Sequence, residues 1–101
     1  MDTPVHKQRG GAQIGWWYRP WPFSFIEIFP DKVIITAAPR KIEIALSDIH
    51  ALTRWLFTAT QFEHNNPKLP EFIVFWGLKQ PEIDKLKSAI SSIQSTQHNH
   101  S

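Results

Sequence analysis

Apolar and polar residues alternate through the middle of the chain in short runs that are typical of β-strands. The clearest run is residues 41–46, in which Ile42 and Ile44 share one side while Lys41 and Glu43 share the other. A period of two indicates a strand with one buried face and one face in water. The sequence therefore predicts a half-buried strand in this segment.

Comparable runs before and after this strand extend the pattern into a sheet. Residues 25–29 and 33–37 are rich in strand-forming residues and flank Pro30-Asp31, which predicts a β-hairpin. Residues 57–63 and 72–76 have the same character. The second of these runs is apolar throughout, so we expect it to be buried on both faces.

The segment 47–57 fits two patterns. Ile49, Leu52 and Leu56 would share one face of a helix, whereas Ile49 and Ala51 begin an alternation that is typical of a strand. Periodicity alone does not separate the two structures in so short an apolar run. We favour the strand, and the helix stays open as the alternative.

The pattern changes to a helical period in the last part of the chain. Ile83, Leu86, Ile90 and Ile93 recur at spacings of three, four and three, which places them on one stripe of an amphipathic helix over Pro81–Ser95. Such a helix does not bury its stripe alone. We therefore expect it to pack on the sheet formed by the preceding strands.

The two ends of the chain differ in composition from the middle. Residues 1–15 contain Gly10 and Gly11 and few apolar side chains, which indicates a flexible N-terminal segment. Residues 96–101 are all polar, which indicates a disordered tail. Between these ends, residues 16–95 show neither an internal repeat nor a linker, so we expect a single domain.

The order of these runs resembles that of the bacterial pleckstrin-homology-like (PH-like) domains. The matching stretches are residues 22–28 as the first strand, then 32–35, 40–49 and 62–64, and finally 72–76 leading into the helix. The resemblance implies a mainly β fold with one C-terminal α-helix, in which a bent antiparallel sheet forms a partly open barrel that the helix caps. It also implies a binding role, and it favours the strand after residue 47.

One feature departs from the lipid-binding members that this family includes. Those members present several Lys or Arg residues around the first hairpin, whereas here the hairpin is Pro30-Asp31-Lys32 and carries one cation. A single lysine is expected to bind a multiply phosphorylated head group only weakly. A membrane lipid is therefore the less favoured partner.

Composition narrows the function further. The 101 residues include no cysteine, which excludes disulfides and thiolate sites and fits a reducing compartment such as the cytoplasm. The formal net charge is +2, and the 11 Lys and Arg residues are scattered, so we expect no nucleic-acid partner. No apolar run approaches the roughly 20 residues of a transmembrane helix.

Candidate catalytic and metal-binding residues are few. Ser47, Asp48 and His50 carry the side chains of a hydrolytic triad, but groups this close in sequence do not converge as a triad requires, and Ser47 and Asp48 suit a turn or a cap. His64 lies beside Glu63, which leaves a small enzyme using this histidine and a nearby carboxylate as an alternative. We expect no catalytic residue, no metal and no cofactor.

An aromatic block between residues 16 and 23 exceeds what a strand normally buries. Pro20 and Pro22 exclude a helix and disfavour a central strand, so the block is at most an extended edge. Either it covers an open end of the barrel, or it is exposed for a partner. The candidate interaction residues are Trp16, Trp17, Tyr18, Arg19, Trp21 and Phe23.

These observations favour a non-catalytic interaction domain. Its expected partner is another protein or a second copy of itself, bound through the aromatic block or through paired sheet edges. The alternatives are a peripheral membrane contact, in which Trp side chains lie at the head-group level, and the small enzyme named above.

Overall fold

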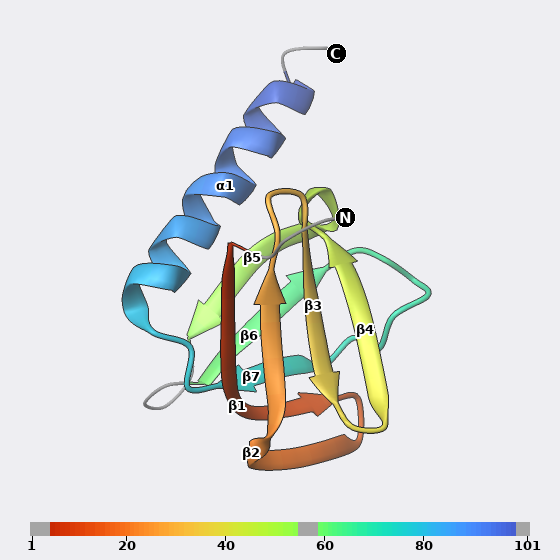
Figure 1. Cartoon of the computed structure of the whole chain (residues 1–101). Helices are drawn as coiled ribbons and strands as arrows, with labels where there is room; N and C mark the ends of the chain where they lie inside the picture. The colour runs from red at the N-terminus through yellow and green to blue at the C-terminus, as the bar shows by residue number, and fades with distance from the viewer. Residues whose placement is uncertain (1–4, 55–58, 99–101) are drawn as a thin grey trace.

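Seven antiparallel strands form one sheet in the computed structural model, which describes residues 5–54 and 59–98. The strand order across the sheet is β4-β3-β2-β1-β7-β6-β5, followed along the chain by one C-terminal helix (Figure 1). The elements are β1 (His6–Ile14), β2 (Trp17–Ile28), β3 (Lys32–Ala37), β4 (Arg40–Ala45), a 3-10 turn η1 (Leu46–Asp48), β5 (Ile49–Arg54), β6 (Ala59–His64), β7 (Ile73–Trp76) and α1 (Gln80–His98).

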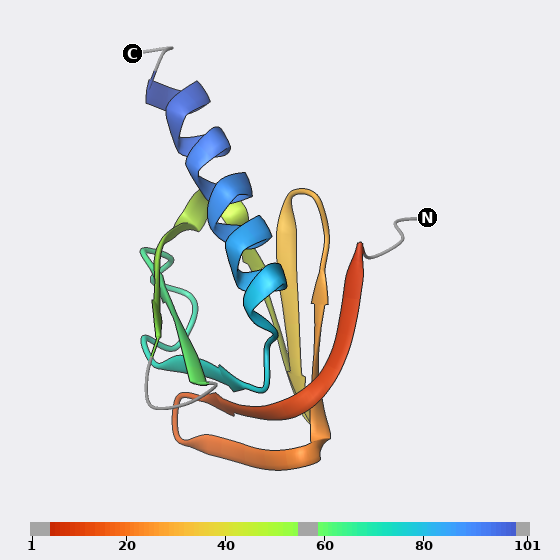
Figure 2. The same ribbon diagram turned by 90° about the vertical axis from the view of Figure 1, so that its left-hand side faces the viewer.

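The sheet bends strongly, so that its two halves face each other as a half-barrel (Figure 2). The helix α1 lies across the open side, and apolar residues from both halves and from the helix form one core. The largest fully buried side chains include Phe62, Phe75, Ile14, Ile26 and Leu86. The expected fold class, mainly β with one C-terminal helix and a bent, partly open barrel, is confirmed.

The expectation of a flexible segment over residues 1–15 is wrong for the part that the structure describes. His6–Ile14 forms β1, which pairs with β2 on one side and with β7 on the other. Its glycines are required by close packing, because a Cβ on Gly10 would overlap the carbonyl oxygen of Trp76 and lie 2.6 Å from the Phe75 ring. The glycines therefore mark a bend in a central strand.

The other predicted strands are found close to their expected positions. The β2–β3 hairpin turns at Pro30-Asp31, and β4 buries Ile42 and Ile44 as its alternation predicts. The run 22–28 is the second strand of the sheet, however, and not the first, because β1 precedes it. The predicted burial of the last strand on both faces is confirmed by Ile73, Val74 and Phe75.

The ambiguous segment resolves as a turn followed by a strand. Leu46–Asp48 forms a single 3-10 turn and Ile49–Arg54 forms β5, so the favoured strand is confirmed. Ser47 and Asp48 lie in the turn, which is one of the two roles expected of them, and no side chain caps it. The remainder of that prediction, residues 55–57, lies outside the described residues, as do the first two residues of the run 57–63.

The C-terminal helix follows the predicted stripe. Ile83, Leu86 and Ile90 are buried in the core and Ile93 packs against it. The helix extends to His98, beyond the predicted Ser95, so the start of the predicted tail is helical and residues 99–101 lie outside the described part. Among the described residues, no helix is long and apolar enough to cross a membrane.

Candidate functional site

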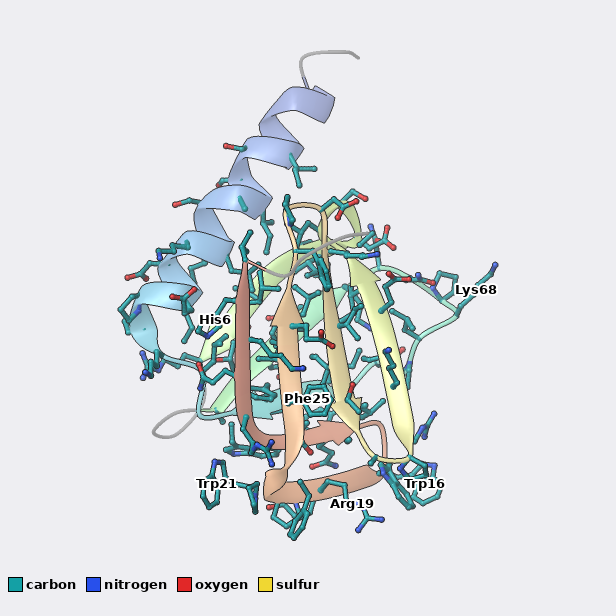
Figure 3. The ribbon with its side chains drawn as sticks, in the orientation of Figure 1. His6, Trp16, Arg19, Trp21, Phe25 and Lys68 are labelled. Carbon is teal, nitrogen blue, oxygen red and sulfur yellow. The ribbon has the colours of Figure 1, made fainter. Side chains whose placement is uncertain are left out.

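The residues of the aromatic block gather at one end of the half-barrel, where β1 turns into β2. Figure 3 shows Trp21, Arg19 and Trp16 spread along this end. Trp16 is 81% exposed, Trp21 69%, Phe23 64% and Tyr18 54%, so the block does not form a buried cover over the barrel end. We call this surface the aromatic patch and define it as Trp16, Trp17, Tyr18, Arg19, Trp21 and Phe23.

A large bulge in β2 produces the exposure of Trp21 and Phe23. Gly10 pairs with Ser24 and Ala12 pairs with Arg19, so two steps along β1 are matched by five steps along β2. Four residues of β2, 20–23, therefore lie opposite Gly11 alone; they leave the ladder and carry Trp21 and Phe23 outward. The base of the bulge is closed by Ser24, whose buried Oγ donates a 3.0 Å hydrogen bond to the carbonyl oxygen of Arg19.

Two side chains of the patch are fixed against the neighbouring β3–β4 turn. The Nε1 of Trp17 donates to the carbonyl oxygen of Ala37 at 2.8 Å, and the Nε of Arg19 donates to that of Ala38 at 2.7 Å. The Arg19 guanidinium also lies 5.1 Å from the centre of the Trp17 ring, within cation–π range. The half-buried Trp17 therefore anchors the patch to the core.

Ring contacts order two of the exposed aromatics, Trp16 and Tyr18. Trp16 packs edge-on against Trp17 with 5.9 Å between ring centres, and Tyr18 packs edge-on against Trp76 with 5.6 Å. Trp76 lies on β7, some sixty residues along the chain, and its contact with the patch was missed because it depends on the β1–β7 pairing. Such edge-to-face contacts restrict the rings before any partner arrives.

His64 braces a loop and is not paired with its neighbouring carboxylate. Its Nδ1 accepts the backbone N–H of Asn66 at 3.1 Å, so its Nε2 is the nitrogen that donates to the carbonyl oxygen of Pro70 at 2.7 Å. The carboxylate of Glu63 instead accepts a hydrogen bond from the Thr53 hydroxyl. Both ring nitrogens are thus engaged with backbone groups.

The other candidate residues for catalysis are not brought together either. Ser47 and His50 are exposed, and Asp48 Oδ2 accepts a 3.2 Å hydrogen bond from the side-chain amide of Asn66. Asp48 and His64 therefore hold the β6–β7 loop from its two sides. Among the described residues, no group of three or more His, Asp or Glu side chains is arranged to hold a metal ion.

A hollow between α1 and the β2–β3 turn was not foreseen from the sequence. It is lined mostly by apolar residues, among them Val5, Phe29 and Leu86, together with Glu82 and Lys85, and has a volume of about 160 Å³. Sites for small organic ligands usually measure about 300–1,000 Å³. This hollow is therefore small for such a ligand, whereas a second one, lined by His64, Asn66 and Glu71 among others, measures about 320 Å³. The aromatic patch is the stronger candidate for an interaction site because four of its large side chains are exposed.

The brace role of His64 gives a first prediction. Replacing His64 with Ala removes the acceptor for Asn66 and the donor to Pro70, which we expect to lower the free energy of unfolding by about 1–2 kcal/mol. Urea denaturation followed by fluorescence measures this change. His50→Ala is the matched control, because His50 is exposed, and it should change stability by less than about 0.5 kcal/mol. Equal losses of unfolding free energy in the two variants would contradict this role of His64 in the loop.

Comparisons with models of known protein families, with curated proteins and with solved structures find no match to this chain.

Proposed function

We propose that this chain is a non-catalytic, PH-like interaction domain that binds another protein, or itself, through the aromatic patch. The observation that carries the proposal is the exposure of four large aromatic side chains at one end of the barrel, namely Trp16, Tyr18, Trp21 and Phe23. The family assignment draws on the bent sheet, the single closing helix and the bacterial PH-like pattern of the sequence. The absence of cysteine makes the cytoplasm the proposed compartment.

The energetics of the patch favour a protein partner. Burying a Trp, Tyr or Phe side chain removes about 150–250 Å² from water, so four such residues offer several hundred Å² of area. Trp, Tyr and Arg also dominate the residues whose loss costs most at protein interfaces. Because Trp17 and Arg19 are already held by the β3–β4 turn, the patch loses little side-chain freedom on binding.

The test compares the wild type with the double variant Trp16→Ser/Trp21→Ser. We expect the wild type either to self-associate with rising concentration or to retain a specific protein from an extract, and the double variant to lose the association that the patch makes. Sedimentation velocity measures self-association, and affinity capture with quantitative mass spectrometry measures the partner.

Val5→Ser is the matched control, because Val5 is an apolar residue that is 68% exposed and lies outside the patch. It should behave as the wild type does. If the wild type stays monomeric and retains the same proteins as the double variant, the patch is not an interaction site.

A peripheral membrane contact is the second candidate, and the exposed Trp16 and Trp21 are what favour it. Trp side chains suit the head-group level of a bilayer, but Arg19 is the single cation within the patch. Co-sedimentation with anionic vesicles that weakens as salt rises supports this candidate. No pelleting at low salt would exclude it.

The small enzyme using His64 is the least supported reading. Both ring nitrogens of His64 bond to backbone groups of the loop, and Glu63 bonds to Thr53. A general base needs a free lone pair that faces a substrate.

A further inference from the structure

The two edge strands of the sheet, β4 and β5, differ in how they are protected. Both have a partner strand on one side, β3 for β4 and β6 for β5, among the residues that the structure describes. An edge strand presents unpaired backbone N–H and C=O groups, and proteins usually block such edges with bulges, prolines, inward-pointing charges or a covering element.

The β5 edge carries such protection. Its register with β6 shifts between Ile49 and Ala51, which is the irregularity that a bulge produces, and α1 packs against the strand. A bulge twists an edge away from a regular ladder. A second strand would therefore not continue the sheet easily on this side.

The β4 edge has neither a bulge nor a proline, and the charged side chains that it carries, Arg40, Lys41 and Glu43, include both signs. Its register with β3 runs without a shift from the Lys32–Ala45 pair to the Ala37–Arg40 pair. The strand contains no proline, and the side chains that point into the barrel at its centre, Ile42 and Ile44, are apolar. In Figure 1, β4 is the last strand of its half of the sheet.

The charges on this edge are self-complementary. Lys41 and Glu43 are both exposed on the outer face, on either side of the inward-facing Ile42. We propose that a second copy of this chain pairs with β4 in an antiparallel, two-fold symmetric arrangement centred on Ile42, which continues the sheet from one copy into the other. In this register Lys41 lies opposite the partner's Glu43, and the symmetry makes the same pair twice.

The position of Glu43 within one chain supports this pairing. Its carboxylate already lies 2.9 Å from the Nζ of Lys32, while 57% of its side chain remains exposed. The Lys32 contact restrains the carboxylate at the edge, so little freedom is lost when a second cation arrives. Dimerisation would place Glu43 between Lys32 of its own chain and the partner's Lys41.

The paired segment is short, which sets the expected strength. Residues 40–44 face one another in the proposed register, so the ladder itself spans five residues in each copy. An interface of this size falls below the roughly 1,200–2,000 Å² of stable complexes. We therefore expect a weak dimer that forms at high protein concentration. The dimer rests on the proposed interaction role, to which it adds a defined partner and a second surface.

Reversing the charge of Lys41 or of Glu43 in the full-length chain tests the proposed register. We expect Lys41→Glu and Glu43→Lys each to weaken dimerisation by about tenfold or more, because each replaces two opposite-charge pairs with two like-charge pairs. The double variant Lys41→Glu/Glu43→Lys restores the opposite-charge pairs across the interface and should dimerise more strongly than either single variant. Its dimer should stay weaker than that of the wild type, because the new lysine at position 43 would lie beside Lys32 in each copy. The two single variants, mixed in equal amounts, should form a heterodimer. Sedimentation equilibrium between about 10 µM and about 1 mM measures all five samples.

The outcomes distinguish dimerisation through the β4 edge from self-association through the aromatic patch. Recovery in the double variant and in the mixture would support the β4 dimer, whatever the patch binds. A wild type that is monomeric throughout, or single variants that dimerise as the wild type does, would overturn it. Dimerisation that is lost in Trp16→Ser/Trp21→Ser and insensitive to the charges would also overturn it, and would assign self-assembly to the patch. Circular dichroism confirms that each variant is folded.

Discussion

Replacing Phe75 with Ala should lower the free energy of unfolding by about 3–5 kcal/mol. The Phe75 side chain is fully buried at the centre of β7, where it packs in the core beneath the bend of β1. Without the ring, the protein loses the free energy gained by transferring it from water to the core. A cavity also remains, which the surrounding strands fill incompletely. Because domains of this size have total stabilities of about 5–15 kcal/mol, a large share of the fold's stability would be lost.

Urea denaturation measures this loss, with Phe23→Ala as the matched control. The control makes the same chemical change in a side chain that is 64% exposed, so it should alter stability by no more than about 0.5 kcal/mol. If the two variants unfolded at the same urea concentration, the division between core and patch described above would be wrong.

Replacing Gly10 with Ala is the second substitution with a large expected effect, although it adds a single methyl group. The new Cβ would overlap the carbonyl oxygen of Trp76 and press on the Phe75 ring. The obstacle includes backbone, so β1 and β7 must move apart. We expect a loss of about 3 kcal/mol in the free energy of unfolding, at the upper end of the range for overpacked sites.

Gly11→Ala provides a graded comparison at the same bend. Its Cβ would lie 3.2 Å from the backbone nitrogen of Trp21, which belongs to the bulge and has room to shift by a few tenths of an ångström. The expected loss is about 1 kcal/mol, measured by the same denaturation. A Gly10→Ala protein as stable as the Gly11→Ala protein would contradict the close approach of β1 to Trp76.

Most of the fold follows from local pattern in the sequence. The β2–β3 hairpin and β4 alternate cleanly between buried and exposed positions, and α1 has a stripe of Ile and Leu at helical spacing. In each of these elements one face is buried against the core, and the side-chain period therefore reports the structure directly.

The first strand could not be found in this way. In β1 the side chains of residues 6–9 are polar, and the buried positions that follow include Gly10 and Gly11. Glycine lowers the intrinsic preference for a strand, and here it is required by a backbone contact with β7 that no local pattern reports. This strand is formed by its pairing with β2 and β7, whereas its sequence alone resembles a flexible N-terminal segment.

The sequence predicted which residues form the aromatic patch, but it did not predict that most of their side chains are exposed. The aromatic content of residues 16–23 identified the candidate residues. The prolines were expected to disfavour a central strand, but β2 lies between β1 and β3, and only its part over Trp17–Arg19 pairs with β1 alone. Whether Trp21 and Phe23 face the core depends on the mismatch of two steps against five between β1 and β2, which is a property of register. The contact of Tyr18 with Trp76 likewise depends on the β1–β7 pairing.

The central position of β1 also bears on how the chain reaches its folded state. β2, β3 and β4 pair through short hairpins, whereas β1 joins this half to the other half by pairing Gly11 with Trp76, 65 positions later. Closing so long a loop is entropically costly, and folding slows as contacts become more distant in sequence. Pairing of β1 with β7 must therefore wait until nearly the whole sheet has been synthesised, and until then that side of β1 is an unpaired strand edge, which favours aggregation.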